Sequence, residues 1–347
     1  MDLAGVAGHF RQFAGTTAHR APLYSRLSEG IAGQPDLLAI LAGAPAAHRL
    51  PVTLFAAVHH LLLADPGDPL AAWYPNLTAA PRADDPVPDF TRFCRERREE
   101  IAGLVNTRLP QTNEIGRSAL LLVGLAAVAA RTGPLAHLDV GASAGLNLLV
   151  EHYGYDFSGH RVGPDRLVLA CEVSGDGTPP AAIPGFTRHL GLDRDPVDLD
   201  DPEQSRWLEA CVWPDQTDRF ARLRAALAIA REHGVEVRRG DAVADLPDAL
   251  DSLGTDGHPV VTTSWVLNYL SDAERAAFQD ALAEWARQRD LSWVFAESPG
   301  FATGLPGFAA GDTTDLTVLG LVEWRGGVRT VRHLATCHPH GYTLRWL

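Results

Sequence analysis

The stretch from His137 to Asn147 constrains the chain most, because it combines a strand pattern with a glycine turn and the start of a helix. Residues 135–140 are short and apolar, which predicts a buried strand. Residues 146–152 predict the first turns of a helix. Gly141 and Gly145 are suited to a tight turn and to a close approach between backbone and ligand. Such a turn is expected to direct free backbone N–H groups at a polar ligand.

Two residues leave the chemistry of this turn open. Asp139 puts a carboxylate beside it, and Ser143 stands where the dinucleotide pattern Gly-x-Gly-x-x-Gly has its middle glycine. The resulting pattern, Asp-x-Gly-x-x-x-Gly, resembles the first motif of class I S-adenosylmethionine-dependent methyltransferases. The same residues also spell Gly-x-Ser-x-Gly, the nucleophile elbow of α/β-hydrolases, in which Ser143 would be the nucleophile.

Charge and composition exclude several classes of function. The chain has 30 basic and 43 acidic residues and a formal net charge of −13, so we expect no nucleic-acid partner. Every basic residue is arginine. The absence of lysine rules out a Schiff-base lysine, an attached pyridoxal phosphate and a P-loop.

Cysteine and histidine spacing predicts neither disulfides nor a metal site. Cys94, Cys171, Cys211 and Cys337 are scattered, which is typical of a reduced cytoplasmic protein. The Cys-His-Pro-His run that ends at His340 has no second ligand cluster, so no metal is expected. The longest apolar run is also shorter than the ~20 residues of a membrane span. A soluble, cytoplasmic protein is therefore predicted.

The pattern of elements predicts two regions. Residues 1–132 favour helices joined by Pro/Gly breaks, and we expect them to form an all-helical N-terminal cap region. Residues 111–114 should open the last of these helices, with Thr112 or Asn113 as N-cap. From residue 133 to 347 strands alternate with helices, which predicts an α/β domain with a mostly parallel sheet and an antiparallel C-terminal edge hairpin around Gly326-Gly327. Residues 154–186 are interpreted as an insertion.

Beyond the first motif, the second half of the chain resembles a class I methyltransferase, which implies a Rossmann-like sheet. The chain is also similar to an uncharacterised bacterial family known as domain of unknown function 2332. The matching stretches include residues 112–118, 140–148, 191–198, 206–208, 213–214, 239–242, 264–270, 296–299 and 340–341. That family has no assigned reaction, so this second resemblance implies no activity.

The methyltransferase resemblance implies S-adenosylmethionine as cofactor and assigns its site. An acid at the end of the second strand would bind the ribose hydroxyls, and Asp193, in Gly-x-Asp-x-x-Pro, fits this role better than Glu172. Asp241 and Ala242 would meet the adenine. The full set of implied cofactor-binding residues is Asp139, Gly141, Ser143, Gly145, Asn147, Asp193, Asp241, Ala242 and Trp265.

The methyl acceptor would bind nearby, because ligands of open α/β sheets lie beyond the C-terminal ends of the strands. We expect Glu114, Asn268, Tyr269 and Glu297, together with Asn113, to form a polar acceptor pocket. Either Glu297 or Glu114 would then act as general base, with its pKa raised by burial. The acceptor itself is expected to be a small molecule or a protein side chain; the sequence makes no prediction about the oligomeric state.

Two other functions remain open. A protein with the methyltransferase fold could bind a ligand without transferring a methyl group. A hydrolase would pair Ser143 with Asp241 or Asp272 and with His333, His338 or His340. The hydrolase is disfavoured because the predicted helical region leaves no strands and no His-Gly-Gly-type oxyanion loop before the turn.

Overall fold

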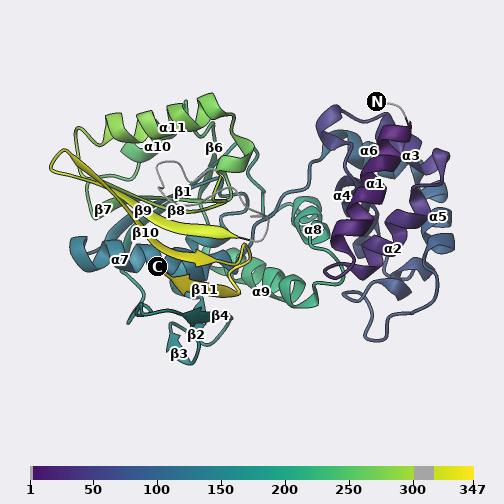
Figure 1. The fold of residues 1–347 in the computed structure, drawn as a ribbon, viewed down its shortest axis with the longest axis horizontal. Coiled ribbons are helices and arrows are strands. Elements are labelled where there is room, and N and C mark those ends of the chain that lie inside the picture. The colour runs from purple at the N-terminus through teal and green to yellow at the C-terminus, as the bar shows by residue number, and fades with distance from the viewer. Residues whose placement is uncertain (1–2, 301–315) are drawn as a thin grey trace. The chain divides into compact units, whose positions relative to one another are not determined.

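The computed structural model describes residues 3–300 and 316–347, and the chain divides into two compact units (Figure 1). Unit 1 comprises residues 1–112 and 199–224; unit 2 comprises residues 113–198 and 225–347. This division differs from the predicted boundary at 132/133. Helix α7 (Arg117–Thr132) belongs to unit 2 because it packs on the sheet, whereas α8 (Pro202–Ala210) packs on α4 (Pro51–Ala64) in unit 1.

Unit 1 is helical throughout its described residues, as the sequence predicts. Proline in the first turn starts α2, α3, α4 and α8, where its missing N–H costs no helical hydrogen bond. Aromatic side chains fill the core, with the rings of Tyr24 and Phe55 stacked 4.3 Å apart. The remaining bounds are α1 (Leu3–Thr17), α2 (Pro22–Ile31), α3 (Pro35–Ala42), η1 (Ala46–His48), η2 (Pro69–Trp73), α5 (Val87–Glu96), α6 (Arg98–Thr107) and the start of α9 (Thr217–His233).

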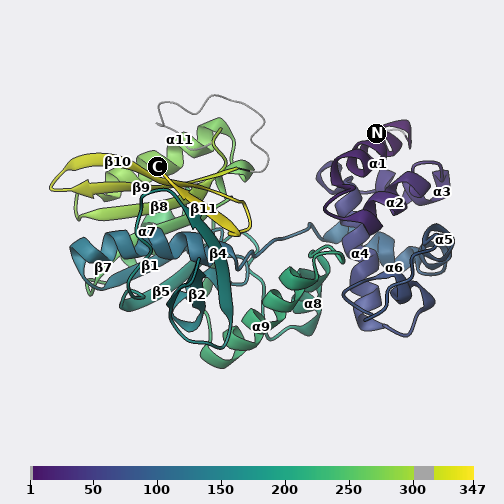
Figure 2. The ribbon, with the colours of Figure 1, turned by 60° about the horizontal axis from the view of Figure 1, so that its bottom comes forward.

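Within the described residues of unit 2, eleven strands form one sheet in the order β3-β2-β4-β11-β10-β9-β8-β7-β1-β5-β6 (Figures 1 and 2). Its strands are β1 (Leu135–Val140), β2 (Gly154–Phe157), β3 (His160–Val162), β4 (Val168–Ser174), β5 (Phe186–Asp193), β6 (Val237–Arg239), β7 (His258–Ser264), β8 (Leu291–Glu297), β9 (Thr317–Arg325), β10 (Val328–Cys337) and β11 (Thr343–Trp346).

The part of the sheet that positions the site is parallel and reverses its order at β1. From β1 the chain adds β5 and then β6 on one side, and later adds β7 and β8 on the other. The antiparallel hairpin of β9 and β10 follows β8, with both turn glycines at positive φ. These features confirm the predicted fold class, an α/β domain with a mostly parallel, Rossmann-like sheet and an antiparallel C-terminal hairpin.

The segment interpreted as an insertion forms β2, β3 and β4, which join the sheet beyond β11 (Figure 2). The chain then returns so that β5 pairs in parallel with β1. Asp193 therefore ends the strand next to β1, whereas Glu172 lies on β4, which pairs with β2 and β11.

The two faces of β1 have different neighbours. Ala136, Leu138 and Val140 belong to the core that includes α10 (Leu246–Asp251) and α11 (Asp272–Trp285). Because side chains alternate along a strand, His137 and Asp139 point to the opposite face. Helix α7 packs on that second face, against β7 and β8. A buried histidine and a buried aspartate thus share one face of the central strand.

Two predicted helix starts are wrong. After the glycine turn the chain forms only two 3-10 turns, η3 (Leu146–Leu148) and η4 (Val150–His152), because it must enter β2 at Gly154. The expected helix over 111–114 begins instead at Arg117, with Gly116 as N-cap. The Asn113 side chain does not cap that helix, because its Oδ1 accepts a hydrogen bond from the backbone N–H of Leu146 (3.1 Å).

Candidate functional site

The glycine turn is tight and well packed. Gly141 has φ +75°, and a Cβ there would lie 2.4 Å from Cγ2 of Val266. Gly145 has φ +72°, and its Cβ would lie 2.9 Å from Cγ2 of Val237. Both positions combine a left-handed backbone with a crowded neighbour, so each requires glycine. Packing within the protein is sufficient to explain both residues.

Three backbone donors of this turn already have acceptors within the protein. Gly141 N–H donates to the Leu192 carbonyl (2.8 Å), and Gly145 N–H donates to the Ala142 carbonyl (2.8 Å). Ser143 N–H donates to Asp193 Oδ2 (2.7 Å). These three N–H groups are therefore not free for a ligand, since the protein satisfies them itself.

Two carboxylates lie at the C-terminal ends of the neighbouring strands β1 and β5. Asp139 is 3% exposed, and Thr262 donates a hydrogen bond to its Oδ1 (2.7 Å). Burial raises the pKa of Asp139 to about 7, the Thr262 hydrogen bond opposes this rise, and the negative charge of Asp193 adds to it. Asp193 accepts hydrogen bonds from the N–H groups of Ser143 and Asp195 (2.8 Å for the second). The two carboxylates repel each other when both are ionised. A cationic group bound beside them would relieve this repulsion.

Ser143 is the third polar group here. It is 6% exposed and has φ +55°, and its hydroxyl has no hydrogen-bond partner among the described residues. A left-handed serine after a strand is compatible with a nucleophile elbow. A nucleophilic serine needs a base within hydrogen-bond reach, however, and in the described part of the chain no histidine bonds to Ser143. The geometry therefore favours a hydroxyl that meets a ligand over an activated nucleophile.

Asn147 follows the turn and has a structural role. Its Oδ1 accepts a hydrogen bond from the Ser118 hydroxyl (2.8 Å) in the buried contact between η3 and α7. This oxygen is already used by the protein.

Glu297 ends β8 and is fully buried. Its two carboxylate oxygens accept hydrogen bonds from the N–H groups of Val266 (3.1 Å) and Leu267 (3.3 Å). Burial raises the pKa of Glu297 to about 7, although these hydrogen bonds and the Arg117 charge oppose the rise. A carboxyl group with this pKa exchanges protons near neutral pH, as a general base must.

The segment after β7 contains Trp265, a predicted cofactor-binding residue, and the predicted acceptor residues Asn268 and Tyr269. Trp265 has φ +57°, and its indole N–H donates to the Thr317 hydroxyl (2.7 Å). Asn268 Oδ1 is buried without a partner among the described residues. Tyr269 is 79% exposed and so does not line a buried pocket. Of these three residues, Asn268 is the one with a buried polar atom still available to a ligand.

Glu114 lies before α7 and is bound to a different loop. Its carboxylate accepts a hydrogen bond from Gly116 N–H (3.1 Å) and lies 3.0 Å from His340 Nδ1. Glu114 and Glu297 thus have different partners, and a common acceptor pocket stays a prediction.

Arg117 also belongs to this site, although it is not among the residues predicted from the sequence. Its guanidinium donates to the carbonyls of Pro339 (2.9 Å) and Ser264 (3.0 Å), and its charge acts on both Asp139 and Glu297. The sequence indicates only that Arg117 lies on a polar face at the start of an apolar helix. Its role could not be predicted, because its partners Pro339 and Ser264 are distant in the sequence.

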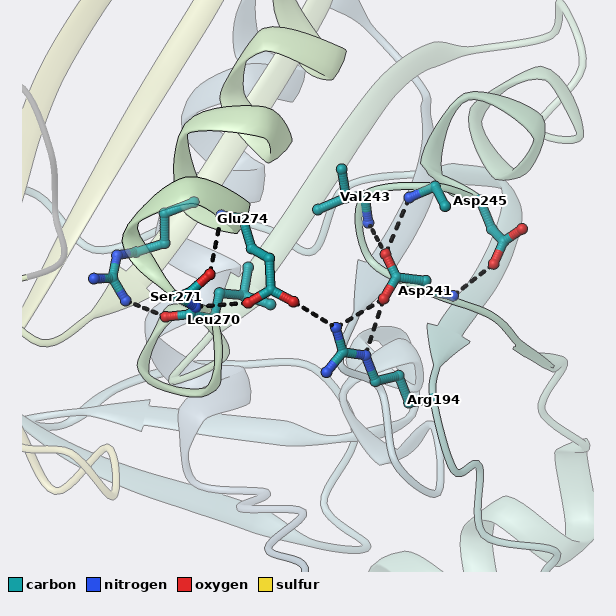
Figure 3. A network of polar contacts seen from close by, with 9 residues as sticks. Arg194, Asp241, Val243, Asp245, Leu270, Ser271 and Glu274 are labelled. Atoms are coloured by element: carbon teal, nitrogen blue, oxygen red, sulfur yellow. Dashed lines mark hydrogen bonds and ion pairs between the residues drawn. The ribbon is translucent and has the colours of Figure 1, made fainter.

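Asp241, predicted to meet adenine, stabilises a loop (Figure 3). One oxygen accepts hydrogen bonds from the Val243 (2.8 Å) and Ala244 (3.0 Å) N–H groups, and the other accepts from Arg194 (2.8 and 3.0 Å). These hydrogen bonds lower its pKa. Arg194 continues to Glu274 (3.1 Å), which forms a capping box with Ser271 at the start of α11. Ala242, also predicted to meet adenine, lies in this loop and is partly buried.

A surface depression occurs at the amino-terminal ends of the strands, on the opposite side from the glycine turn. It is lined by residues that include Thr187, His258, Arg289 and Asp290. Arg289 is held there by the carbonyls of Gly254, Thr255 and Gly257. Ligands of open α/β sheets bind at the carboxyl ends of the strands, so this amino-terminal edge is not the favoured site.

Neither a metal-binding cluster nor a membrane-spanning helix is found among residues 3–300 and 316–347. There, no group of three or more His, Cys, Asp or Glu side chains is arranged to hold a metal ion. Over the same residues, no helix combines the length and apolarity needed to cross a membrane.

The geometry therefore defines an α/β protein whose polar groups gather where the strand order reverses. The chain belongs to the family described as "Uncharacterized protein conserved in bacteria (DUF2332)", whose model matches residues 7–346. No curated protein matches it. One similar solved structure is a S-adenosylmethionine-dependent methyltransferase from Clostridium acetobutylicum ATCC 824, with 11% identity over 70% of this chain and 79% of that chain and a TM-score of 0.26.

Proposed function

We propose that the chain binds S-adenosylmethionine where β1, β5 and β7 end, and transfers its methyl group to a small molecule or protein side chain. The observation that supports this most is the pair of carboxylates, Asp139 and Asp193, beside the unpaired hydroxyl of Ser143. The order reversal at β1 is where open α/β sheets bind ligands. Two neighbouring carboxylates favour a positively charged ligand, and this cofactor carries an ammonium group and a sulfonium group.

The residues at the turn fit part of the cofactor. The Asp139 carboxylate would accept a hydrogen bond from the cofactor's ammonium group. The Ser143 hydroxyl, which has no partner among the described residues, would form its hydrogen bond with the cofactor. Asp193 contributes negative charge while it holds the turn through Ser143 N–H. When bound, the cofactor supplies an electrophilic methyl group. The protein's task is then mainly to position an acceptor in line with that group.

Proton removal from the acceptor would fall to Glu297. Its pKa of about 7 suits a general base, and its oxygens are oriented by the N–H groups of Val266 and Leu267. Asn268, with its buried unpaired Oδ1, would accept a hydrogen bond from the same substrate. A protein that binds the cofactor but transfers no methyl group would use Asp139 and Ser143 in the same way. It would have no role for Glu297 and Asn268.

The test is calorimetric titration of the full chain with S-adenosylmethionine and with S-adenosylhomocysteine. Asp139→Asn should weaken binding by about tenfold or more, because hydrogen bonds to charged groups contribute ~1.5–3 kcal/mol. Asp193→Ala should weaken it too, whereas Glu172→Gln, an exposed acid on β4, should leave binding unchanged. Absence of binding by the wild-type protein at millimolar cofactor would refute the proposal.

A further inference from the structure

A continuous line of side chains connects buried Asp139 to the protein surface. Thr262 Oγ1 lies 2.7 Å from Asp139 Oδ1 and 2.8 Å from His137 Nε2. His137 Nδ1 lies 3.3 Å from His189 Nδ1, and His189 Nε2 lies 3.0 Å from Glu151 Oε1. His137 and Thr262 are fully buried, whereas the side chains of His189 and Glu151 are 22% and 34% exposed.

Strand register explains why these residues meet. On β1, His137 and Asp139 are two residues apart and share a face. His189 on β5 is the parallel partner of His137, and Thr262 on β7 is the partner of Asp139. Glu151 comes from η4, which follows the glycine turn. The line therefore depends on the pairing of three central strands.

The four contacts need four protons, and two arrangements supply them with the same net charge. In the first, Thr262 donates to ionised Asp139, His137 Nε2–H donates to Thr262, and a doubly protonated His189 donates to His137 Nδ1 and to ionised Glu151. In the second, protonated Asp139 donates to Thr262, Thr262 donates to His137 Nε2, His137 Nδ1–H donates to neutral His189, and His189 donates to Glu151.

We propose that these five side chains form a proton relay that ionises Asp139 when a cationic group arrives beside it. The Asp139 O–H bond breaks as a new Thr262 O–H bond forms, and the original Thr262 hydroxyl proton passes to His137 Nε2. The His137 Nδ1–H bond then breaks as the His189 Nδ1–H bond forms. One positive charge thereby moves to His189 beside Glu151, and no other reactant is needed.

The energetics of the end groups suit this exchange. Burial raises the pKa of Asp139 to about 7, so its charged form is disfavoured until a cation compensates. Burial lowers the pKa of His137 well below its usual range, so this ring stays neutral and passes protons by changing tautomer. At the far end, burial opposes the ionisation of Glu151, but the His189 hydrogen bond and charge lower its pKa overall.

Other charged groups surround the line at its two ends. Asp193 and Arg117 act on Asp139, from β5 and α7. His152 lies 3.9 Å from Glu151 and stacks on His233 of α9 at 3.7 Å. Glu232 acts on His152 and is itself paired with Arg166. None of these groups interrupts the four contacts.

The inference deepens the proposed function, since the cationic group would be the ammonium of the cofactor, but its test needs no cofactor. The change is Glu151→Gln in the full chain, read by ¹⁵N NMR of the His137 ring and ¹³C NMR of the Asp139 carboxyl between pH 5 and 8. Loss of the Glu151 charge disfavours the His189 cation. The ratio of the His137 Nδ1–H to Nε2–H tautomers should therefore rise about fivefold, the size expected for a partly exposed ion pair, and the pKa of Asp139 should rise.

The sign of the second readout is diagnostic, because removing a negative charge would by itself lower the pKa of Asp139. Thr262→Val should abolish both responses to Glu151→Gln, since it breaks the line between Asp139 and His137. Thr187→Val is the matched control, as this threonine on β5 bonds outside the line, to the Leu135 and Asp256 carbonyls, and should preserve both.

An unchanged His137 tautomer in Glu151→Gln would overturn the relay, and this variant alters only a partly exposed side chain. Equal responses in the Thr262→Val and Thr187→Val backgrounds would overturn it as well. Because these readouts are taken without cofactor, a failure of S-adenosylmethionine to bind would refute the proposed function and leave the relay standing.

Discussion

Glu297 gives the sharpest stability prediction, because it is a fully buried carboxyl group whose pKa is raised from 4.5 to about 7. The folded state holds a proton there that the unfolded state has already released between these two pH values. Stability from this group is therefore fully present below about pH 4.5 and is lost as the pH rises through about 7. At about 1.4 kcal/mol for each pH unit, the loss amounts to roughly 3 kcal/mol.

The perturbation is Glu297→Gln, which keeps the shape and cannot ionise. At pH 5 the variant should be less stable than wild type by ~1–3 kcal/mol, since its amide group can accept only one of the two N–H hydrogen bonds, from Val266 and Leu267. At pH 8 wild type carries the buried charge and the variant does not. The difference in unfolding free energy should therefore shrink by roughly 3 kcal/mol and vanish or reverse.

The assay is urea unfolding of both proteins at pH 5, 6, 7 and 8, with near-UV circular dichroism as the signal. Comparing the two proteins at each pH removes the contribution of Asp139, whose raised pKa gives both of them a slope of the same sign. Glu172→Gln, an exposed change on β4, is the matched control. A difference between wild type and Glu297→Gln that stays constant from pH 5 to 8 would refute the reasoning.

Two further predictions concern the glycine turn. Gly141→Ala should cost more than Gly254→Ala in urea unfolding, because both have φ +75° but only the first would meet a side chain, Val266 at 2.4 Å. The left-handed backbone accounts for ~1–2 kcal/mol in each, and overpacking should add ~1–3 kcal/mol at Gly141. Ser143→Ala should leave methyl transfer within roughly tenfold, and a fluorophosphonate probe should not label Ser143 in the wild-type protein. Covalent labelling at this residue would establish the hydrolase reading instead.

The sequence was sufficient for features that local patterns determine. The apolar run at 135–140, the acid that ends β5 and the Gly326-Gly327 turn are each encoded within a few residues, and the structure has β1, β5 and the β9–β10 hairpin at those places. Period-two and glycine signals act over the length of one strand, so they are legible without knowledge of the neighbours.

Features that depend on pairing between distant segments could not be predicted. The strand over 168–174 pairs with 343–345, and no local pattern announces this partner. The helix expected after the glycine turn is replaced by 3-10 turns because β2 begins so soon afterwards. His137 and Thr262 are adjacent only through strand register, so the sequence presents them as two unrelated polar residues in apolar runs.

The missing helix also bears on the class of ligand. Dinucleotide-binding folds hold pyrophosphate on free N–H groups at a helix N-terminus. Here only short 3-10 turns follow the glycines, Asn113 accepts the Leu146 N–H, and Asp193 accepts the Ser143 N–H. Asp139 adds a second carboxylate at the same place, so a phosphate would meet two acids and few donors. Electrostatics at this turn therefore favour a cationic ligand over a nucleotide phosphate, which is the reason we prefer S-adenosylmethionine to a dinucleotide.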